Sequence, residues 1–288
     1  MKNEYLPDHS YRIPKEGEYI ISFSGGRSSA YMLYRIHSAN YGIPNNAKVL
    51  FANTGKEDPR TLDFVQAVSD NMGIDIIWLE YWYDEQAKGY SDPKNKVRVV
   101  DYETAARNGE PFESLIRNRN YYLPNVTQRF CTMELKVQSI DRYMRRVHGI
   151  KDYYKFLGIR YDEPNRWAKA LLTEDCKSLF PMVTNKITKQ DVLNHWKYQP
   201  YDLKTPDLLG NCDMCFLKGR RKLQETIRQY PENVKWWIEQ ENKCLEFRKD
   251  NLFEQSNARF FNGETYTQLK ERTSREQRLW GGGNGCAN

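Results

Sequence analysis

Three cysteines are the residues of this sequence best suited to metal or sulfur chemistry. Cys212 and Cys215 lie two residues apart in "NCDMC", and Cys131 opens the earlier segment "CTMELK". Cysteines at C-x-x-C spacing can share one metal ion or supply two ligands of an iron–sulfur cluster. The same spacing suits a redox pair, and a single cysteine such as Cys131 also fits a helix as a small buried hydrophobic residue.

The stretch "SFSGGRSSAYMLYR" follows an apolar run and has the composition of an anion-binding loop. Gly25 and Gly26 allow backbone N–H groups to approach an anion closely, and Ser24, Ser28 and Ser29 add hydroxyl donors. The helix that follows would direct its positive end to the same place. The spacing of a Walker A loop is absent. The alternative is a glycine-rich turn with a serine that caps the helix.

Regular elements must bring these residues together, and their order predicts the fold class. Apolar runs predict strands at 18–24, 48–54, 74–81 and 153–159. Helical spacing follows at 28–39, 59–72 and 131–147, with Pro59 at a first helical position. Strands that alternate with helices at these lengths predict an α/β fold with a doubly wound, mostly parallel sheet. Ligands bind such sheets at the carboxyl ends of the strands, where the glycine-rich loop lies.

The remaining segments suggest two units. The long polar stretch 82–128 is expected to hold one helix, at 111–119, and Thr188 is placed to cap a helix over 187–198. We therefore predict a nucleotide-binding α/β domain over 1–200. Residues 201–288 should form a helical lobe that carries the C-x-x-C pair. Its helices are expected at 217–229 and 232–249, followed by a flexible polar tail.

Composition limits the classes of protein. The chain has 288 residues, of which 39% are hydrophobic, and a formal net charge of +6, enough to favour anionic ligands without proving nucleic-acid binding. The first residues contain no apolar signal region, and no run of eighteen apolar residues occurs. These features predict a cytoplasmic protein with no membrane partner. Its six cysteines are then expected to serve as thiols rather than disulfides.

Five segments in order resemble the phosphoadenosine phosphosulfate (PAPS) reductase family. This family belongs to the adenine nucleotide α-hydrolase superfamily, which includes the PP-loop ATP pyrophosphatases. The segments are "SFSGGRSS", "FANTGKEDPRTLDFV", "CTMELKVQSIDRYM", "LGIRYDEPNR" and "FPMVTNKITKQDVLNHW", and "NCDMC" stands where iron–sulfur members carry their C-x-x-C pair. The resemblance covers about residues 18–216 and implies a shared adenine-nucleotide scaffold, which does not by itself settle the reaction.

The resemblance implies which residues hold the nucleotide. Ser24 to Ser29 would bind phosphate or sulfate, and Asn53, Thr54 and Gly55 would lie beside the nucleotide. Arg160 and Arg166 suit a sulfate or phosphate because a guanidinium group matches a pair of oxygens. Their alternative role is in ion pairs at the surface.

The resemblance also implies a [4Fe–4S] cluster bound by Cys131, Cys212 and Cys215. Iron–sulfur reductases of the family have a Cys-Cys pair at the first of these positions, whereas this chain has Phe130 before Cys131. The fourth ligand is therefore open. Lys136 would reach the anionic group of the nucleotide or the surroundings of the cluster, where a positive charge favours the reduced form. Alternatively, Lys136 is a lysine on the surface of a helix without a role in the site.

Cys286, in "GGGNGCAN", has three possible roles. It could be the fourth cluster ligand, or the nucleophile that sulfonucleotide reductases of the family carry near the C-terminus. The family context E-C-G-x-H is absent here, so an ordinary exposed thiol is the third possibility. Without Cys286 as a ligand, three cysteines would leave one iron open, which suits an enzyme that carries an extra sulfide.

The glycine-rich loop departs from the S-G-G-x-D-S pattern of ATP pyrophosphatases. Ser28 replaces the aspartate that suits Mg²⁺, and Arg27 precedes it. The loss of a carboxylate and the gain of a cation favour a more anionic ligand and weaken the case for a metal–pyrophosphate complex. Mg²⁺ stays open as a cofactor.

Three functions from different classes are consistent with these features. The first is an oxidoreductase that acts on an adenine sulfonucleotide such as PAPS or APS and uses a dithiol reductant. The second is an ATP-dependent sulfurtransferase that takes sulfur from a donor protein and thiolates a nucleic acid or another acceptor. The segments "RNRNYY" and "KGRRK" support it, although basic runs are also common on solvated surfaces. The third is a regulatory protein that binds a nucleotide and a cluster or zinc without catalysis.

Overall fold

The computed structural model describes residues 9–83, 97–171, 177–249, 258–261 and 263–281. Its centre is a six-stranded sheet in the order β4-β3-β2-β1-β5-β6. All strand pairs are parallel except β3 with β4. The strands are β1 (Tyr19–Phe23), β2 (Ala47–Asn53), β3 (Ile76–Glu80), β4 (Arg98–Val100), β5 (Tyr154–Leu157) and β6 (Ser178–Leu179). The sheet confirms the predicted doubly wound α/β class.

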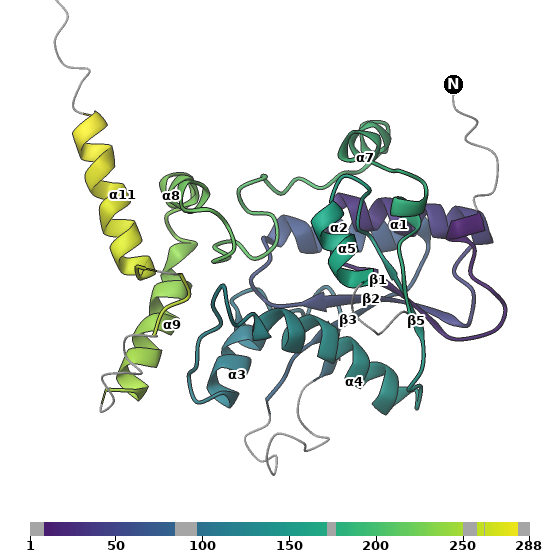
Figure 1. The fold of residues 1–288 in the computed structure, drawn as a ribbon, viewed down its shortest axis with the longest axis horizontal. Helices are drawn as coiled ribbons and strands as arrows, with labels where there is room; N and C mark the ends of the chain where they lie inside the picture. The colour runs from purple at the N-terminus through teal and green to yellow at the C-terminus, as the bar shows by residue number, and fades with distance from the viewer. Residues whose placement is uncertain (1–8, 84–96, 172–176, 250–257, 262, 282–288) are drawn as a thin grey trace, which may run out of the picture.

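The helices are arranged on both faces of the sheet and in a separate group beside it (Figure 1). Along the sheet they are η1 (His9–Tyr11), α1 (Arg27–Asn40), α2 (Pro59–Met72), α3 (Glu110–Asn118), η2 (Thr132–Val137), α4 (Gln138–Val147), α5 (Pro164–Leu171), α6 (Pro181–Thr184) and α7 (Lys189–Trp196). The group beside the sheet comprises α8 (Arg220–Gln229), α9 (Val234–Phe247) and α11 (Tyr266–Gly281). None of the described helices is both long and apolar enough to cross a membrane.

The two faces of the sheet are packed by different helices. Side chains of α1, α2 and α7 form one core with alternate residues of β1 and β2, such as Ile21 and Val49. On the opposite face, Ile20 and Leu50 pack against α4. The central strands are buried on both sides, which explains why their sequences are continuous apolar runs.

Two helix starts have the caps that their sequences indicate. Asp58 accepts a hydrogen bond from the backbone N–H of Arg60, and α2 begins at Pro59 as predicted. Thr188 and Asp191 form a reciprocal capping box at the start of α7. Such caps satisfy backbone donors that lack partners in the first turn.

The lobe beside the sheet has its own core, which begins earlier in the chain than expected. Phe112 of α3, within the polar stretch, packs with Trp237, Phe260 and Tyr266 of the lobe. Helix α3 thus belongs to the same core as the later helices. The division of the chain at residue 200 stays a prediction.

The sequence predicts only a polar tail after residue 249, and the structure forms a further helix within it, α11 at residues 266–281. Tyr266, Leu269 and Thr273 are buried at three- and four-residue spacing, while most of the surrounding residues are charged or polar. This narrow buried stripe is a weak sequence signal. The tail from residue 282, which includes Cys286, lies outside the described residues.

A buried carboxylate joins α9 to the start of α11. Glu241 is 1% exposed and accepts hydrogen bonds from the backbone N–H groups of Phe260 (3.2 Å) and Tyr266 (2.8 Å). Burial raises the pKa of Glu241 to about 7, because the charged form loses its hydration, although the two N–H donors partly oppose the shift.

This pKa predicts that the lobe loses stability as the pH rises. The folded-state pKa lies above that of the unfolded chain, so the stabilisation is complete below the unfolded pKa and is lost as the pH passes about 7. Between pH 5.5 and 8 the free energy of unfolding should fall by about 2 kcal/mol from this group. Urea unfolding at the two pH values measures this fall in the free energy of unfolding, and the variant Glu241→Gln should show little of it. An equally steep change in that variant would contradict the assignment.

Candidate functional site

The glycine-rich loop connects β1 to α1 and is tightly built. Gly25 has φ +73°, and a Cβ atom there would lie 2.8 Å from Cγ2 of Thr61. The Ser29 hydroxyl accepts a hydrogen bond from the Ser24 N–H (3.1 Å) and donates one to the Gly26 carbonyl (2.9 Å). The loop therefore has a defined shape at the N-terminus of α1, where backbone N–H groups favour an anion.

The segment after β5 packs directly against this loop. A Cβ atom on Gly158 would lie 2.7 Å from the Ser29 Cα, so only glycine allows the two backbones to approach this closely. Arg160 then reaches across and donates a hydrogen bond from Nη1 to the Ser28 hydroxyl at 2.9 Å. Arg166 pairs instead with Glu163 and its side chain is 62% exposed. The structure thus brings Arg160, but not Arg166, into contact with the loop.

Arg27 is already engaged elsewhere. Its guanidinium group makes two hydrogen bonds to Asp202, at 2.7 and 2.8 Å, and one to the Leu203 carbonyl. The positive charge that was expected to favour a more anionic ligand is therefore compensated by a carboxylate in this structure.

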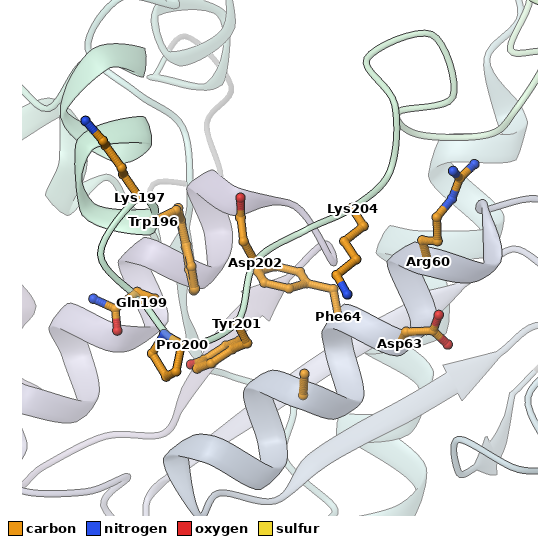
Figure 2. Close-up of a pocket in the computed structure, with 11 residues that line it drawn as sticks. Arg60, Asp63, Phe64, Trp196, Lys197, Gln199, Pro200, Tyr201, Asp202 and Lys204 are labelled. Atoms are coloured by element: carbon orange, nitrogen blue, oxygen red, sulfur yellow. The ribbon is translucent and has the colours of Figure 1, made fainter.

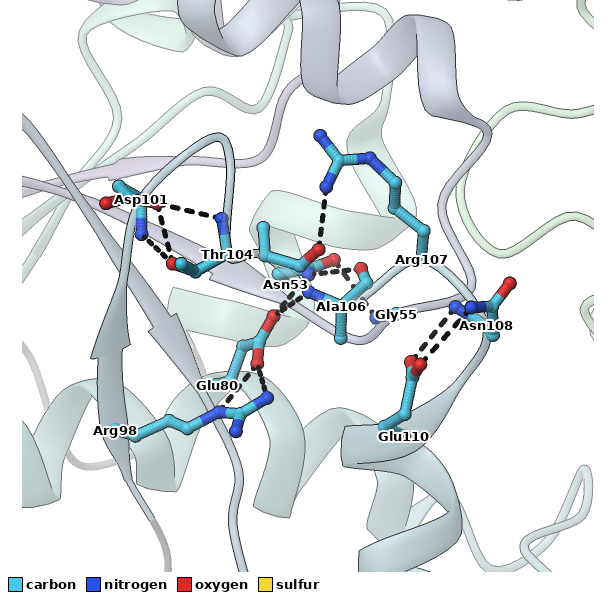
Figure 3. A network of polar contacts seen from close by, with 11 residues as sticks. Asn53, Gly55, Glu80, Arg98, Asp101, Thr104, Ala106, Arg107, Asn108 and Glu110 are labelled. Atoms are coloured by element: carbon cyan, nitrogen blue, oxygen red, sulfur yellow. Dashed lines mark hydrogen bonds and ion pairs between the residues drawn. The ribbon is translucent and has the colours of Figure 1, made fainter.

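The end of β2 is fixed by a buried polar network (Figure 3). The Asn53 amide donates to Glu80 (2.6 Å) and to the Ala106 carbonyl (2.8 Å), and its oxygen accepts from the Gly55 N–H (3.0 Å). Glu80, which is fully buried, also pairs with Arg98. Asn53 therefore shapes the backbone beside the predicted nucleotide site through contacts within the protein.

The C-x-x-C segment packs against this same strand end. The Thr54 hydroxyl lies 3.5 Å from the Cys212 sulfur, and Glu57 and Cys212 form an isolated β-bridge. The Asp213 N–H donates to the Lys56 carbonyl at 2.9 Å. The predicted nucleotide shelf, Asn53 to Gly55, and the cysteines therefore share one edge of the sheet.

Cys131, Cys212 and Cys215 form what we call the thiol cluster, because Cys215 interacts electrostatically with each of the other two. Burial raises the pKa of Cys131 to about 11 and also raises the pKa values of Cys212 and Cys215. Their thiols are therefore protonated at neutral pH. Among the residues that the structure describes, no group of three or more His, Cys, Asp or Glu side chains is arranged to hold a metal ion.

Lys136 lies beside the thiol cluster and pairs with Glu57, with 3.5 Å between Nζ and Oε1. Burial acts to lower the pKa of Lys136, but the Glu57 carboxylate opposes this through its charge and its hydrogen bond, and the net shift of the pKa is upward. The ammonium group is therefore held in its charged form next to the sulfur atoms.

The other cysteines are placed differently. Cys244 is buried in the lobe core on α9. Cys176 and Cys286 lie outside the described residues, so the predicted roles of Cys286 stay predictions.

Sequence reasoning missed the buried charges that surround the thiol cluster. Glu57 accepts hydrogen bonds from the N–H (3.0 Å) and hydroxyl (2.7 Å) of Thr54. Asp213 pairs with Lys56 at 3.1 Å, and Lys218 donates to the Asp213 carbonyl. Burial lowers the pKa of Lys218 to about 8. The available signal was the presence of charged residues inside the motifs "NTGKEDP" and "NCDMC".

A pocket of about 460 Å³ lies between the first turns of α2 and the segment after α7 (Figure 2). Phe64, Trp196 and Tyr201 line it together with Asp202. It is connected to the glycine-rich loop, because Asp202 binds the Arg27 side chain and the Trp196 indole donates to the Arg27 carbonyl at 2.9 Å. The pocket contains none of the residues predicted to bind a ligand.

Comparison with known proteins gives three similarities. Residues 18–183 match the family model of the phosphoadenosine phosphosulfate reductase domain. The uncharacterized nin region protein ORF290 of Escherichia phage lambda is 32% identical over 209 residues, which are 71% of this chain and 67% of that protein. A solved U34-tRNA thiolase, NcsA from Methanococcus maripaludis with its [4Fe-4S] cluster, is 14% identical at a TM-score of 0.38, covering 92% of this chain and 74% of that chain.

The two loop glycines give a matched pair for testing the loop geometry. Gly25→Ala should destabilise the fold by about 1–3 kcal/mol, since it combines positive φ with contacts to Thr61 and other core atoms. Gly26→Ala should change stability by less than about 0.5 kcal/mol, because φ is −103° and the nearest atom is 3.7 Å away. Urea unfolding of both variants is the measurement, and equal losses would contradict the geometry.

Proposed function

The chain belongs to the phosphoadenosine phosphosulfate reductase domain family, and we propose that it is an enzyme that binds an adenine nucleotide and carries out sulfur chemistry beside it. The observation that supports this most directly is the contact between the Thr54 hydroxyl and the Cys212 sulfur, 3.5 Å apart. Through this contact, Cys212 lies against the strand end that would carry the nucleotide.

In this proposal the nucleotide lies along the carboxyl edge of β1 and β2. Backbone N–H groups and hydroxyls of the loop Ser24–Ser29 bind its phosphate or sulfate. Arg160 adds a guanidinium group at Ser28, where its side chain already lies. The shelf from Asn53 to Gly55 would border the nucleoside, with the position of its backbone fixed by Glu80.

The thiol cluster would hold a [4Fe–4S] cluster. Its three thiols have the soft sulfur chemistry that such clusters need, and all three are half-buried. The described side chains are not yet arranged as a metal site, so the thiols would have to move together when iron binds. The raised pKa values mean that each cysteine must lose its proton when iron binds. Lys136 would supply positive charge that favours the reduced cluster. When bound, the cluster would supply electron transfer or a site for sulfide.

The reaction we favour is reduction of an adenine sulfonucleotide. A cysteine thiolate attacks the sulfate sulfur, so that an S–S bond forms and the bond from sulfur to the phosphate oxygen breaks. The adenosine phosphate departs with that oxygen, and a dithiol partner then releases sulfite while it is oxidised to a disulfide. Cys286 is the proposed nucleophile.

The second candidate is ATP-dependent transfer of sulfur to a nucleic acid. It is supported by arginine guanidinium groups that lie over two aromatic rings of the segment before Cys131, Tyr122 and Phe130. The Arg119 guanidinium lies 4.5 Å from the ring centroid of Phe130, and that of Arg248 lies 5.4 Å from Tyr122. Arginine and aromatic side chains together suit unpaired bases. Release of pyrophosphate from ATP would favour this reaction, whereas sulfite with AMP or adenosine bisphosphate would favour the first.

The proposed cluster predicts iron loss from specific variants. Anaerobically purified protein should contain about four irons and four sulfides per chain. Cys131→Ser, Cys212→Ser and Cys215→Ser should each lose most of the iron, whereas the matched control Cys244→Ser, in the lobe core, should keep it. Zinc, or no metal, in the parent protein would contradict the cluster.

Cys286→Ser, measured in the same series, separates the roles of that residue. Loss of the iron would make Cys286 the fourth ligand and would contradict its role as nucleophile. Full iron with loss of sulfite production would support the nucleophile. Full iron with full activity would exclude Cys286 from both roles.

The loop predicts a difference between the two family arginines. Arg160→Ala should weaken binding of adenosine phosphosulfate or ATP about tenfold or more, because it removes a charged donor beside the anion. Arg166→Ala should change the affinity less than about twofold, since this exposed residue pairs with Glu163. Isothermal titration calorimetry checks both. A larger loss in Arg166→Ala would contradict the placement of the anion.

A further inference from the structure

We propose that the π-helical turn η2 is a positioning element that directs Cys131 and Lys136 to the same side, toward the segment that carries Cys212. The part of this proposal that concerns iron binding rests on the proposed function of the thiol cluster. The geometry of the turn itself is independent of any metal.

The separation of the two residues requires such a turn. Cys131 and Lys136 are five residues apart. On an α-helix five residues advance by roughly 500°, which leaves the two side chains about 140° apart around the axis. In a π-helix the backbone bonds join residues five apart, so these residues lie one above the other as i and i+4 do in an α-helix.

The surroundings of both side chains agree with a shared face. The Lys136 ammonium group pairs with Glu57, whose backbone forms a β-bridge with Cys212. Cys131 packs against the same hydrophobic core as Cys212. The opposite side of the turn is solvated, with Met133 49% and Val137 43% exposed.

The spacing between buried residues changes from η2 to α4. Glu134 and Leu135 are buried, and the next buried pair, Ser139 and Ile140, follows after five residues. From there the buried pair Tyr143 and Met144 follows after four residues, as in a regular α-helix.

Specific contacts hold the turn in its π form. The Gln138 N–H bonds to the Met133 carbonyl, five residues earlier. The buried Ser139 hydroxyl donates to the Glu134 carbonyl at 3.0 Å, also five residues earlier. The Glu134 carboxylate is fixed by Arg142 at 2.7 Å and by Arg119 at 3.3 Å. The turn is thus anchored from its buried side.

Chemical bridging can test the shared face without iron. In a Cys212→Ser, Cys215→Ser background, we would add Lys136→Cys and, separately, the exposed control Val137→Cys. Dibromobimane, which fluoresces when it joins two nearby thiols, is then applied, and the bridged peptides are mapped by mass spectrometry. On an α-helix both new cysteines would be far from Cys131, so the yields would be similarly low. The π turn predicts efficient bridging for Lys136→Cys only. Equal yields would overturn the proposal.

A deletion and an insertion test whether the turn matters for the thiol cluster. Deletion of the exposed Met133 leaves Cys131 and Lys136 four apart, so an ordinary α-helix keeps them on one face. Insertion of alanine after Met133 separates them by six and turns them apart. The deletion should keep the iron content and the urea midpoint of the parent chain, whereas the insertion should lose most of the iron. Retained iron in the insertion variant, or equal iron loss in both, would overturn the role of the turn. If the parent chain holds no iron, the cluster fails while the bridging result still decides the geometry.

Discussion

Three segments meet at Glu57, through its carboxylate and its backbone, and the arrangement of the site depends on this residue. One oxygen accepts two hydrogen bonds from Thr54, while the other faces the Lys136 ammonium group, and the backbone of Glu57 bridges to Cys212. A buried carboxylate is costly unless it is paired and hydrogen-bonded. These contacts offset that cost, and they also link the end of β2, the C-x-x-C loop and η2 to one another.

The site lies between two hydrophobic cores rather than inside one. The sheet with α1 and α2 forms the first, and the lobe with α3 forms the second. Buried polar groups connect them. Asp213, beside the cysteines, pairs with Lys56 after β2 and accepts from the Trp237 indole in the lobe core at 2.8 Å. A contact of this kind fixes the orientation of the lobe more specifically than apolar packing does, because its geometry tolerates little movement.

The sequence predicts what is local and misses what depends on distant partners. The strands, the start of α2 at Pro59 and the cap at Thr188 follow from short-range patterns, and all are found. The pairing of Arg27 with Asp202 joins residues that are 175 positions apart, and no local pattern indicates it. The π turn was hidden for another reason: 131–147 has general helical spacing, and only the interval between buried residues, first five and then four, distinguishes it. The roles of the predicted site residues stay predictions.

The electrostatics of the glycine-rich loop determine where discrimination between ligands must arise. Arg27 is compensated by Asp202, and Arg160, although it reaches Ser28, also pairs with Asp162 at 2.8 Å. In the proposed function, backbone N–H groups and hydroxyls at the start of α1 would therefore share the binding of the anion with Arg160, and such groups bind phosphate and sulfate oxygens by the same geometry. In this proposal, selection between a sulfonucleotide and ATP would then depend on the C-x-x-C side of the proposed site. There the Lys136 ammonium group lies near the sulfur atoms of Cys212 and Cys215. A sulfonucleotide differs from ATP most in its electrophilic sulfur, which a thiolate can attack.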